Sequence, residues 1–396
     1  MGKNRPKGGL LGGFDQLRAP DAPTISVTAG NAQVSVAFTN PSDVGGGAIS
    51  SYTATAIASG VSTGVTSASS PITITGLTNG TSYSVTGLAN NAFGSSPYSD
   101  ATSSSPALTR GVFSAGYPNL NTIDYINVAS TGNATDFGDL NGNGMDTSGA
   151  SNSTRGLTST YRESGTSSTD RCEYITFASA SNATDFGNIT VSRTGGMGCS
   201  NDTRAIFMGG KSSTTNYNTI DYFTIASTGD ATDFGDLSVA RGSMHDGTVN
   251  SNTRGCATGG YVEGGSNSNV IDYITMASTG NASDFGDMLS AKYYSAGASS
   301  TTRGLMAGGN SDQNVIQYIT IASTGNATDF GDLTVSKNGR AGVCSKSRAV
   351  FGGGDSDTNV MDYVEIATTG NATDFGDLTV ARSYLSGTSS NHGGLS

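Results

Sequence analysis

Six copies of one sequence module occupy the chain from residue 123 onward. Each copy begins with an apolar stretch that contains a tyrosine, continues through a polar turn, and ends with NATDFGDL or a near variant. The phenylalanine of each copy lies twelve residues after the tyrosine, whereas successive tyrosines are 49, 48, 51, 45 and 45 residues apart. The tyrosines are Tyr125, Tyr174, Tyr222, Tyr273, Tyr318 and Tyr363, and the phenylalanines are Phe137, Phe186, Phe234, Phe285, Phe330 and Phe375. A rigid module joined by connections of variable length is therefore repeated six times.

A repeat of this length predicts the blades of a propeller. Units of 45–51 residues are too long for the coils of a β-helix, and helical repeats need an apolar period of about 3.6 residues that is absent here. The chain is rich in glycine and polar residues, and only 13% of its residues are charged, a composition that disordered segments share. The fixed register of tyrosine and phenylalanine favours order instead, with many short strands joined by Gly, Asn and Ser turns. The predicted fold class is all-β.

The composition argues against several functions. A net charge of −11 disfavours nucleic acid as a partner, and no run of 18 apolar residues is present that could insert into a membrane. Two histidines are too few for a His-rich metal centre or a convincing catalytic triad, so we expect no enzyme, no metal and no cofactor. Four cysteines without a CxxC spacing are predicted to be free thiols in the core. They are Cys172, Cys199, Cys256 and Cys344.

Residues 1–19 are predicted to form an arm that has no core of its own. Its basic residues stand among two Gly-Gly pairs, with few large apolar groups. Such a segment is either a frayed terminus or a peptide that orders on a partner, and we take the second, an anchoring arm, as the working hypothesis. The residues that would carry the anchoring are Lys3, Arg5, Lys7, Leu10, Leu11 and Phe14.

Residues 20–107 are expected to form a small antiparallel sandwich. Apolar and polar residues alternate with period two in several segments that are separated by turn residues. The run GLTNGTSYSVTGLANNAFGSSPYS resembles a fibronectin type III domain, with Leu77 and Tyr83 where that family has its tyrosine corner. Phe38 stands where the family usually has a buried tryptophan. The resemblance implies a spacer and protein-contact module.

A second marker is an arginine at the start of each unit, mostly within TRG. These residues are Arg110, Arg155, Arg204, Arg254, Arg303 and Arg348. A strand after a basic residue, a strand ending in Gly-Gly, a strand with tyrosine and a fourth strand together resemble the kelch family, although phenylalanine replaces the family's tryptophan. The resemblance implies a six-bladed kelch-like propeller over residues 108–396. The final strand, in ARSYLSGTSS, would complete the first blade and leave no free sheet edge.

Residues that recur in all six units are predicted to be structural, because a catalytic site needs a unique cluster whereas scaffold contacts recur in each blade. The phenylalanines are expected to pack between neighbouring blades. The arginines and the aspartates of the DFG triplets are expected to form a ring of ion pairs or backbone hydrogen bonds. These aspartates are Asp136, Asp185, Asp233, Asp284, Asp329 and Asp374.

The candidate binding residues lie in the longer connections. Nearly all length variation falls between the Gly-Gly strand and the tyrosine strand, and three consecutive units have long inserts there. Variable loops on a rigid scaffold usually carry recognition, although solvated decoration remains the alternative. The candidates are Tyr161, Arg162, Glu163, Tyr217, Tyr261 and Glu263.

The repeated wording IASTGNATDFGDLTV, joined to a fibronectin type III-like segment, resembles structural proteins of tailed bacteriophages, notably those of aquatic cyanobacteria. The resemblance implies a virion component whose arm binds other virion proteins and whose propeller contacts a host-surface glycan or protein. A tail fibre or appendage is the favoured interpretation. A capsid decoration protein and a bacterial surface adhesin are the alternatives, and a homo-oligomer stays open.

Overall fold

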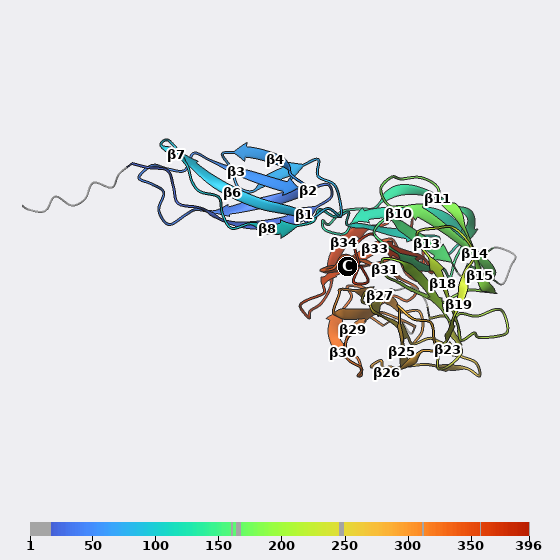
Figure 1. Cartoon of the computed structure of the whole chain (residues 1–396). Helices are drawn as coiled ribbons and strands as arrows, with labels where there is room; N and C mark the ends of the chain where they lie inside the picture. The colour runs from blue at the N-terminus through green and yellow to red at the C-terminus, as the bar shows by residue number, and fades with distance from the viewer. Residues whose placement is uncertain are drawn as a thin grey trace, which may run out of the picture. The chain divides into compact units, whose positions relative to one another are not determined.

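The computed structural model describes residues 17–159, 161–163, 168–244, 249–310, 313–356 and 358–395. The described chain is all-β, and it divides into two compact units with the boundary between Leu108 and Thr109 (Figure 1). None of the described residues belongs to a helix that is long and apolar enough to cross a membrane. The proposed anchoring residues of the arm, Lys3 to Phe14, lie outside the described residues.

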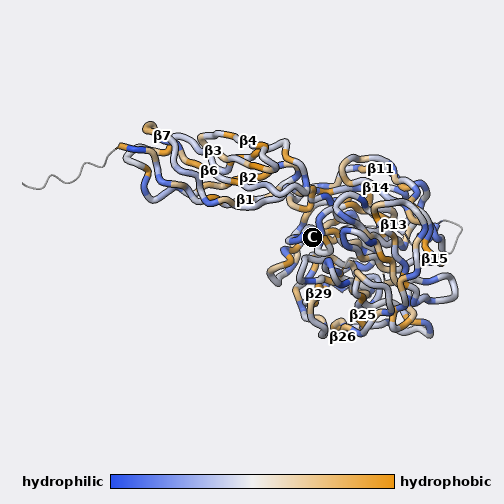
Figure 2. Tube along the Cα trace, in the orientation of Figure 1, coloured by the Kyte–Doolittle hydropathy of each residue, from blue (hydrophilic) through white to orange (hydrophobic). Residues whose placement is uncertain are grey.

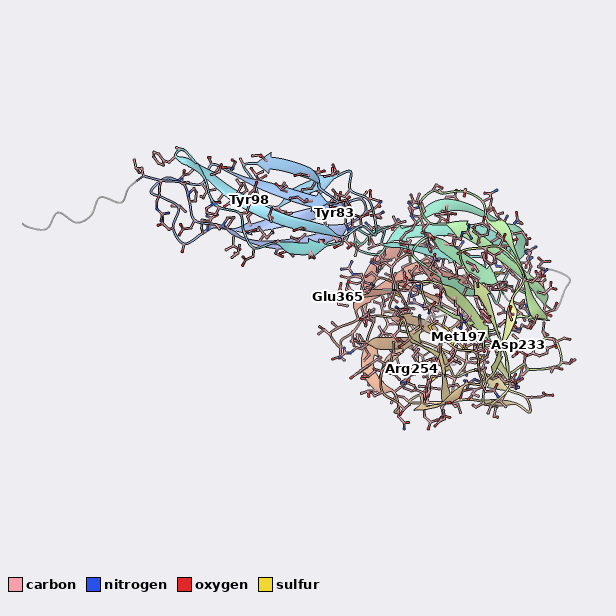
Figure 3. The ribbon with its side chains drawn as sticks, viewed as in Figure 1. Tyr83, Tyr98, Met197, Asp233, Arg254 and Glu365 are labelled. Atoms are coloured by element: carbon pink, nitrogen blue, oxygen red, sulfur yellow. The ribbon has the colours of Figure 1, made fainter. Side chains whose placement is uncertain are left out.

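Two antiparallel sheets make up the first unit. One contains β1 (Thr24–Gly30), β2 (Gln33–Thr39) and β5 (Ile72–Thr75); the other contains β3 (Ser51–Ala58), β4 (Val61–Ser67), β6 (Tyr83–Asn91), β7 (Gly94–Ser95) and β8 (Thr102–Ser104). Alternate residues of β2, β3 and β6 are buried, as the period-two pattern predicts. Figure 2 shows the hydropathy of the residues along these strands. Phe38 stacks on Tyr52 with 4.6 Å between ring centroids, and the Tyr83 hydroxyl accepts a hydrogen bond from Thr78 N. Tyr83 is labelled in Figure 3. This unit is compatible with a β-sandwich.

The second unit contains six four-stranded antiparallel sheets within its described residues. The first combines β9 (Arg110–Ser114), β10 (Leu120–Asn127) and β11 (Thr135–Gly144) with β35 (Ser386–Ser389). The second has β12 (Ser148–Ser151), β13 (Arg155–Ser159), β14 (Thr169–Thr176) and β15 (Thr184–Arg193), and the third has β16 (Met197–Ser200), β17 (Arg204–Met208), β18 (Thr219–Thr224) and β19 (Thr232–Asp236).

The remaining three sheets follow the same order. They are β21 (Val249–Asn250), β22 (Arg254–Thr258), β25 (Val270–Thr275) and β26 (Ser283–Asp287); β27 (Ala296–Ser299), β28 (Arg303–Ala307), β29 (Val315–Thr320) and β30 (Thr328–Asp332); and β31 (Ala341–Cys344), β32 (Arg348–Gly352), β33 (Val360–Glu365) and β34 (Thr373–Asp377). A small sheet of β20 (Arg241–Gly242), β23 (Tyr261–Val262) and β24 (Ser266–Asn267) joins two connections. The four cysteines are buried and free, as predicted.

Hydrogen bonds join each sheet to the next and finally return to the first. In every unit, the residue after the DFG triplet donates its backbone N–H to the Asn or Asp side chain of the following unit's turn. The pairs are Asp139 to Asn182, Asn188 to Asp230, Asp236 to Asn281, Asp287 to Asn326, Asp332 to Asn371 and Asp377 to Asn133, at 3.0–3.1 Å. The sixth pair connects the last sheet to the first, which is compatible with a propeller-like arrangement.

The glycine of each DFG triplet permits this close approach. At Gly235, for example, φ is +147°, and an added Cβ would lie 2.5 Å from the backbone oxygen of Gly280 in the next unit. Any side chain there would collide with backbone that cannot move without separating the sheets. The strict repetition of this glycine is therefore explained by contact between sheets.

The six repeated phenylalanines are each 2% exposed, and each meets its tyrosine edge-on with 5.6–6.0 Å between ring centroids. The repeated arginines lie over those tyrosine rings, at 4.3–4.8 Å from the centroid, and donate to backbone carbonyls of the following unit. The acceptors are Phe177, Ile225, Met276, Ile321, Ile366 and Val128, in the order of the arginines. Backbone hydrogen bonds are thus present at all six arginines, and Arg348 also pairs with Glu365 at 2.6 Å.

The DFG aspartates are placed differently from the arginines. All six are exposed to solvent, and Asp233 is an example (Figure 3). The buried ion pairs between described residues use other carboxylates.

Candidate functional site

A second set of polar residues, five of them acidic, lies between the sheets and was missed by the sequence analysis. The residue directly before each repeated tyrosine is completely buried in all six units. These residues are Asp124, Glu173, Asp221, Asp272, Gln317 and Asp362. Four of them pair with buried arginines of the preceding unit: Arg382–Asp124 (3.0 Å), Arg193–Asp221 (2.7 Å), Arg241–Asp272 (2.9 Å) and Arg340–Asp362 (2.5 Å). Burial lowers the pKa of each arginine, and the paired aspartate opposes that shift.

Two of these positions depart from the pattern. Glu173 pairs with Arg171 at 3.1 Å and accepts a hydrogen bond from the Tyr161 hydroxyl at 3.4 Å. Gln317 is neutral, and it faces the interface where Lys292 stands in place of the arginine. The Lys292 ammonium donates to Gly308 O at 2.9 Å. Since the other contacts recur between sheets, we assign this set to the scaffold.

At one position of each unit the backbone conformation repeats but the side chain differs from unit to unit, and we call these six residues the rim. One residue of each unit, in the connection that precedes the first strand of the next sheet, has a left-handed backbone. These residues are Asp146, Gly195, Ser243, Tyr294, Gly339 and Tyr384, with φ of 54°, 62°, 50°, 60°, 67° and 57°. The same backbone position thus carries a carboxylate, a hydroxyl, two phenols and two glycines.

Backbone hydrogen bonds join neighbouring rim positions in a cycle. The bonds run from Asp146 N to Tyr384 O (2.9 Å), Tyr384 N to Gly339 O (2.7 Å), Gly339 N to Tyr294 O (3.4 Å), Tyr294 N to Ser243 O (3.0 Å), Met244 N to Gly195 O (3.0 Å) and Gly195 N to Asp146 O (2.9 Å). These bonds involve only main-chain atoms, and they form at positions that carry glycine as well as at positions that carry tyrosine.

A pocket of about 390 Å³ opens at the rim. Its lining residues are Tyr117, Asp146, Arg162, Tyr294, Asp355, Ser356, Ser383 and Tyr384. Bridges between Met145 and Arg162 and between Tyr117 and Ser383 hold the contributing connections against one another. The connections between second and third strands therefore meet the rim at the same end of the sheets.

The charges of this rim pocket are arranged asymmetrically. Arg162 Nε lies 3.3 Å from Asp146 Oδ2, and the two side chains are 42% and 3% exposed. Asp355 adds a second carboxylate to the lining. Burial raises the pKa of Tyr384, and a hydrogen bond to Asp355 adds to this shift. Burial also raises the pKa of Tyr294, and the negative charge of Asp146 adds to that shift. Both phenols therefore stay protonated at neutral pH and can donate as well as accept hydrogen bonds.

A row of tyrosines leads away from the pocket. Tyr384, Tyr294, Tyr293 and Tyr261 contact one another in sequence, with ring centroids 4.9, 4.9 and 6.0 Å apart. Tyr261 is exposed on the connection between β22 and β25. The row joins the pocket to one of the long connections singled out from the sequence.

The six predicted binding residues do not form one site. Arg162 lines the pocket, whereas Glu163 pairs with Arg171 at 2.7 Å. Tyr217 is half-buried and Tyr261 and Glu263 are exposed. The prediction of Tyr161 as a binding residue is wrong, because its side chain is not accessible to a ligand.

Tyr161 is completely buried, and its ring lies under Arg171. The physical reason is Gly144, which stands where four other units have a buried arginine or lysine. A Cβ on Gly144 would lie 2.6 Å from the Tyr161 ring, so the ring fills the space that the missing side chain leaves.

The five remaining pocket side chains of chemical interest were missed by the sequence analysis. They are Tyr117, Asp146, Tyr294, Asp355 and Tyr384. A signal was present for the rim members, because YSAG and YLSG break the pattern of the other copies immediately before a first strand. Their convergence depends on the left-handed rim, which no local pattern reveals.

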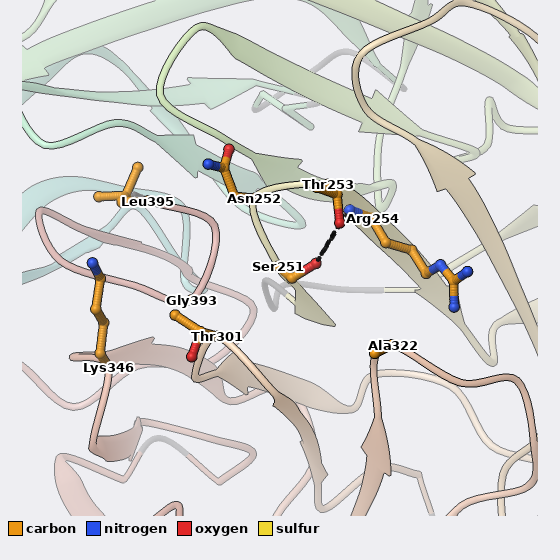
Figure 4. A pocket seen from close by; sticks show the side chains of 9 residues that line it. All are labelled: Ser251, Asn252, Thr253, Arg254, Thr301, Ala322, Lys346, Gly393 and Leu395. Atoms are coloured by element: carbon orange, nitrogen blue, oxygen red, sulfur yellow. Dashed lines mark hydrogen bonds between the residues drawn. The ribbon is translucent and has the colours of Figure 1, made fainter.

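A second pocket, of about 450 Å³, lies at the opposite ends of the strands (Figure 4). Turns between first and second strands line it, including Ser251–Thr253, together with Lys346, Gly393 and Leu395. Arg254 in its wall is already engaged by Ile321 O and the Tyr273 ring. Nearby, His392 is completely buried, and its Nε2 lies 2.8 Å from Ser151 O. The C-terminal segment thus packs against several sheets at this end, so we take the rim pocket as the candidate site.

Neither the protein-family models nor the curated proteins contain a match to the chain. Among the described residues, no group of three or more His, Cys, Asp or Glu side chains could hold a metal ion.

Proposed function

We propose that the second unit is a closed six-bladed kelch-like propeller and that the first is a fibronectin type III-like sandwich. The return of the inter-sheet hydrogen bonds to the first sheet supports the closed ring. Pairing of β35 with β9 supports closure of the first blade by the C-terminal strand. The hydrogen bond between Thr78 N and the Tyr83 hydroxyl supports the tyrosine corner.

We further propose that the protein is a non-enzymatic virion component of a tailed phage, a tail fibre or appendage whose propeller contacts the host surface. The carrying observation is that the DFG and arginine-to-carbonyl contacts recur at every interface between the six sheets, whereas the rim and its neighbouring connections differ from unit to unit. Repeated contacts maintain a scaffold, and a face that varies on a rigid scaffold is suited to recognition. The phage assignment itself rests on the resemblance of the repeated sequence.

The anchoring function of the arm is tested by deleting residues 1–19. We expect the shortened chain to keep the circular dichroism spectrum and thermal unfolding of the full chain but to be missing from purified particles. Normal incorporation would refute the anchor.

The position on the particle is tested by immunogold labelling of the full-length protein. Label on the tail appendages is expected. Label spread over the capsid would replace the tail fibre with a decoration protein, and label on uninfected bacterial cells would indicate a surface adhesin.

A further inference from the structure

We propose that the rim pocket is a binding site for an uncharged pyranose sugar, which is held against Tyr294 and Tyr384 and oriented by Arg162 and Asp355. The proposal rests on the host-contact function above and names the class of ligand. Three independent features of the pocket support it: its polar groups, its aromatic lining and its backbone strain.

The polar groups favour a ligand whose own groups both donate and accept. Arg162 can only donate hydrogen bonds and Asp355 can only accept them, and both line the same pocket. Neighbouring hydroxyl groups of a sugar satisfy both residues, through charge-assisted hydrogen bonds. A cationic ligand would face Arg162, and an anionic ligand would face Asp355 and Asp146, so each charged class meets an unfavourable contact.

The aromatic lining suits the remainder of a sugar ring. Tyr117 is 46% exposed, and Tyr294 and Tyr384 are partly exposed at the rim. Each tyrosine offers an apolar ring for the C–H faces of a pyranose and a hydroxyl for its edge. The volume of about 390 Å³ lies within the range of roughly 300–1,000 Å³ that is usual for small-ligand pockets.

The backbone strain indicates that the two rim tyrosines are not required by the scaffold. Tyr294 and Tyr384 have φ of 60° and 57°, a region that bulky residues rarely occupy. Gly195 and Gly339 occupy the equivalent positions in two other units, where they complete the same cycle of hydrogen bonds. Bulky residues in a strained conformation, at positions where glycine suffices, are typical of functional sites.

The test is a titration of the full-length protein with methyl glycosides of glucose, galactose and mannose, with glucosamine and glucuronate as the cationic and anionic probes. Saturation-transfer NMR detects binding, and tyrosine emission follows it because the chain contains no tryptophan. We expect at least one neutral glycoside to bind and both charged probes to bind at least tenfold more weakly or not at all.

The variants Tyr384→Gly and Tyr294→Gly test the aromatic wall, and Asp355→Asn tests the acceptor. Each should weaken binding of the neutral sugar by tenfold or more, while the thermal midpoint shows that the protein remains folded. Two control variants should bind as the parent does. Tyr98→Ala removes an exposed tyrosine of the first unit, and Lys346→Ala changes the opposite pocket.

The outcomes separate this proposal from the proposed function. Neutral-sugar binding that survives all three pocket variants would overturn the site. If glucosamine or glucuronate binds more tightly than the neutral glycosides, and the pocket variants abolish that binding, the ligand is not an uncharged sugar. The rim pocket would then still be a binding site, and the proposed host contact would stand. If none of the probes binds, the proposed sugar site is refuted, and attachment of labelled protein to host cells then decides whether host contact survives.

Discussion

The interface with Lys292 and Gln317 allows a quantitative test of how buried charge contributes to the scaffold. Lys292 is 2% exposed, and burial lowers its pKa from 10.5 to about 8. Gln317 is completely buried, its Oε1 accepts from Leu289 N at 2.8 Å, and its Nε2 has no hydrogen-bond partner among the described residues. Three other units have an aspartate here whose arginine partner occupies the position equivalent to Lys292. The informative perturbation is therefore Gln317→Glu, which restores a carboxylate.

The shift in the pKa of Lys292 sets the size of the effect. Between about pH 8 and pH 10.5, the unfolded chain binds a proton that the folded chain has released, so stability rises with pH in this window. A shift of this size corresponds to roughly 3 kcal/mol, which is the penalty for keeping the ammonium charged at neutral pH. A carboxylate at position 317 should raise the pKa of Lys292 and remove most of this rise, although its own burial offsets part of the gain.

Calorimetric unfolding of the full-length protein from about pH 7 to about pH 10 measures the effect. Lys292→Met is the matched control, because it removes the titrating group and should also abolish the rise. Comparison with the parent cancels the titration of tyrosines and cysteines, which all three proteins share. Equal pH dependence in the parent, Gln317→Glu and Lys292→Met would refute the reasoning.

Three further predictions concern the scaffold. Asp272→Asn leaves Arg241 buried without a counter-charge, and it should cost roughly 3–5 kcal/mol in urea-induced unfolding; a loss below about 1 kcal/mol would contradict it. Burial lowers the pKa of His392 to about 4 from 6.5, so stability should fall as pH falls through this window, and His392→Asn should flatten the acid profile; an unchanged profile would count against it. Gly235→Ala should lower the thermal midpoint much more than Gly229→Ala, since both have positive φ but only Gly235 faces the next sheet's backbone; equal losses would mean that the contact is unimportant.

Much of the scaffold could be predicted from the sequence because its contacts recur. The fixed spacing of tyrosine and phenylalanine indicates one strand pair per unit, and the structure places each such pair in adjacent strands, as in β33 and β34. The all-β fold class is confirmed. The length variation also identified the connections that reach the rim, and one of them contributes Arg162.

The buried charges and the pocket could not be predicted in the same way. The aspartate before each tyrosine is visible in the sequence, but its partner lies in the preceding unit, and Glu173 and Gln317 obscure the pattern. Arg340 stands three residues beyond the position of the other paired arginines, so simple alignment pairs Asp362 with Lys337 instead. The rim pocket combines residues more than two hundred positions apart, which only the closing of the sheet cycle brings together.

The rim shows how a repeated scaffold can carry an asymmetric site. Its cycle of hydrogen bonds uses main-chain atoms only, and the buried ion pairs between the sheets involve none of the six rim residues. Glycine at two of the six positions shows that the smallest side chain suffices for folding. Folding therefore does not explain which residues stand at the other four positions. The two tyrosines are the bulkiest of these four, and they line the same pocket as Arg162 and Asp355. The repeated contacts between sheets thus serve folding, and the six rim positions are left to vary in a way that can serve recognition.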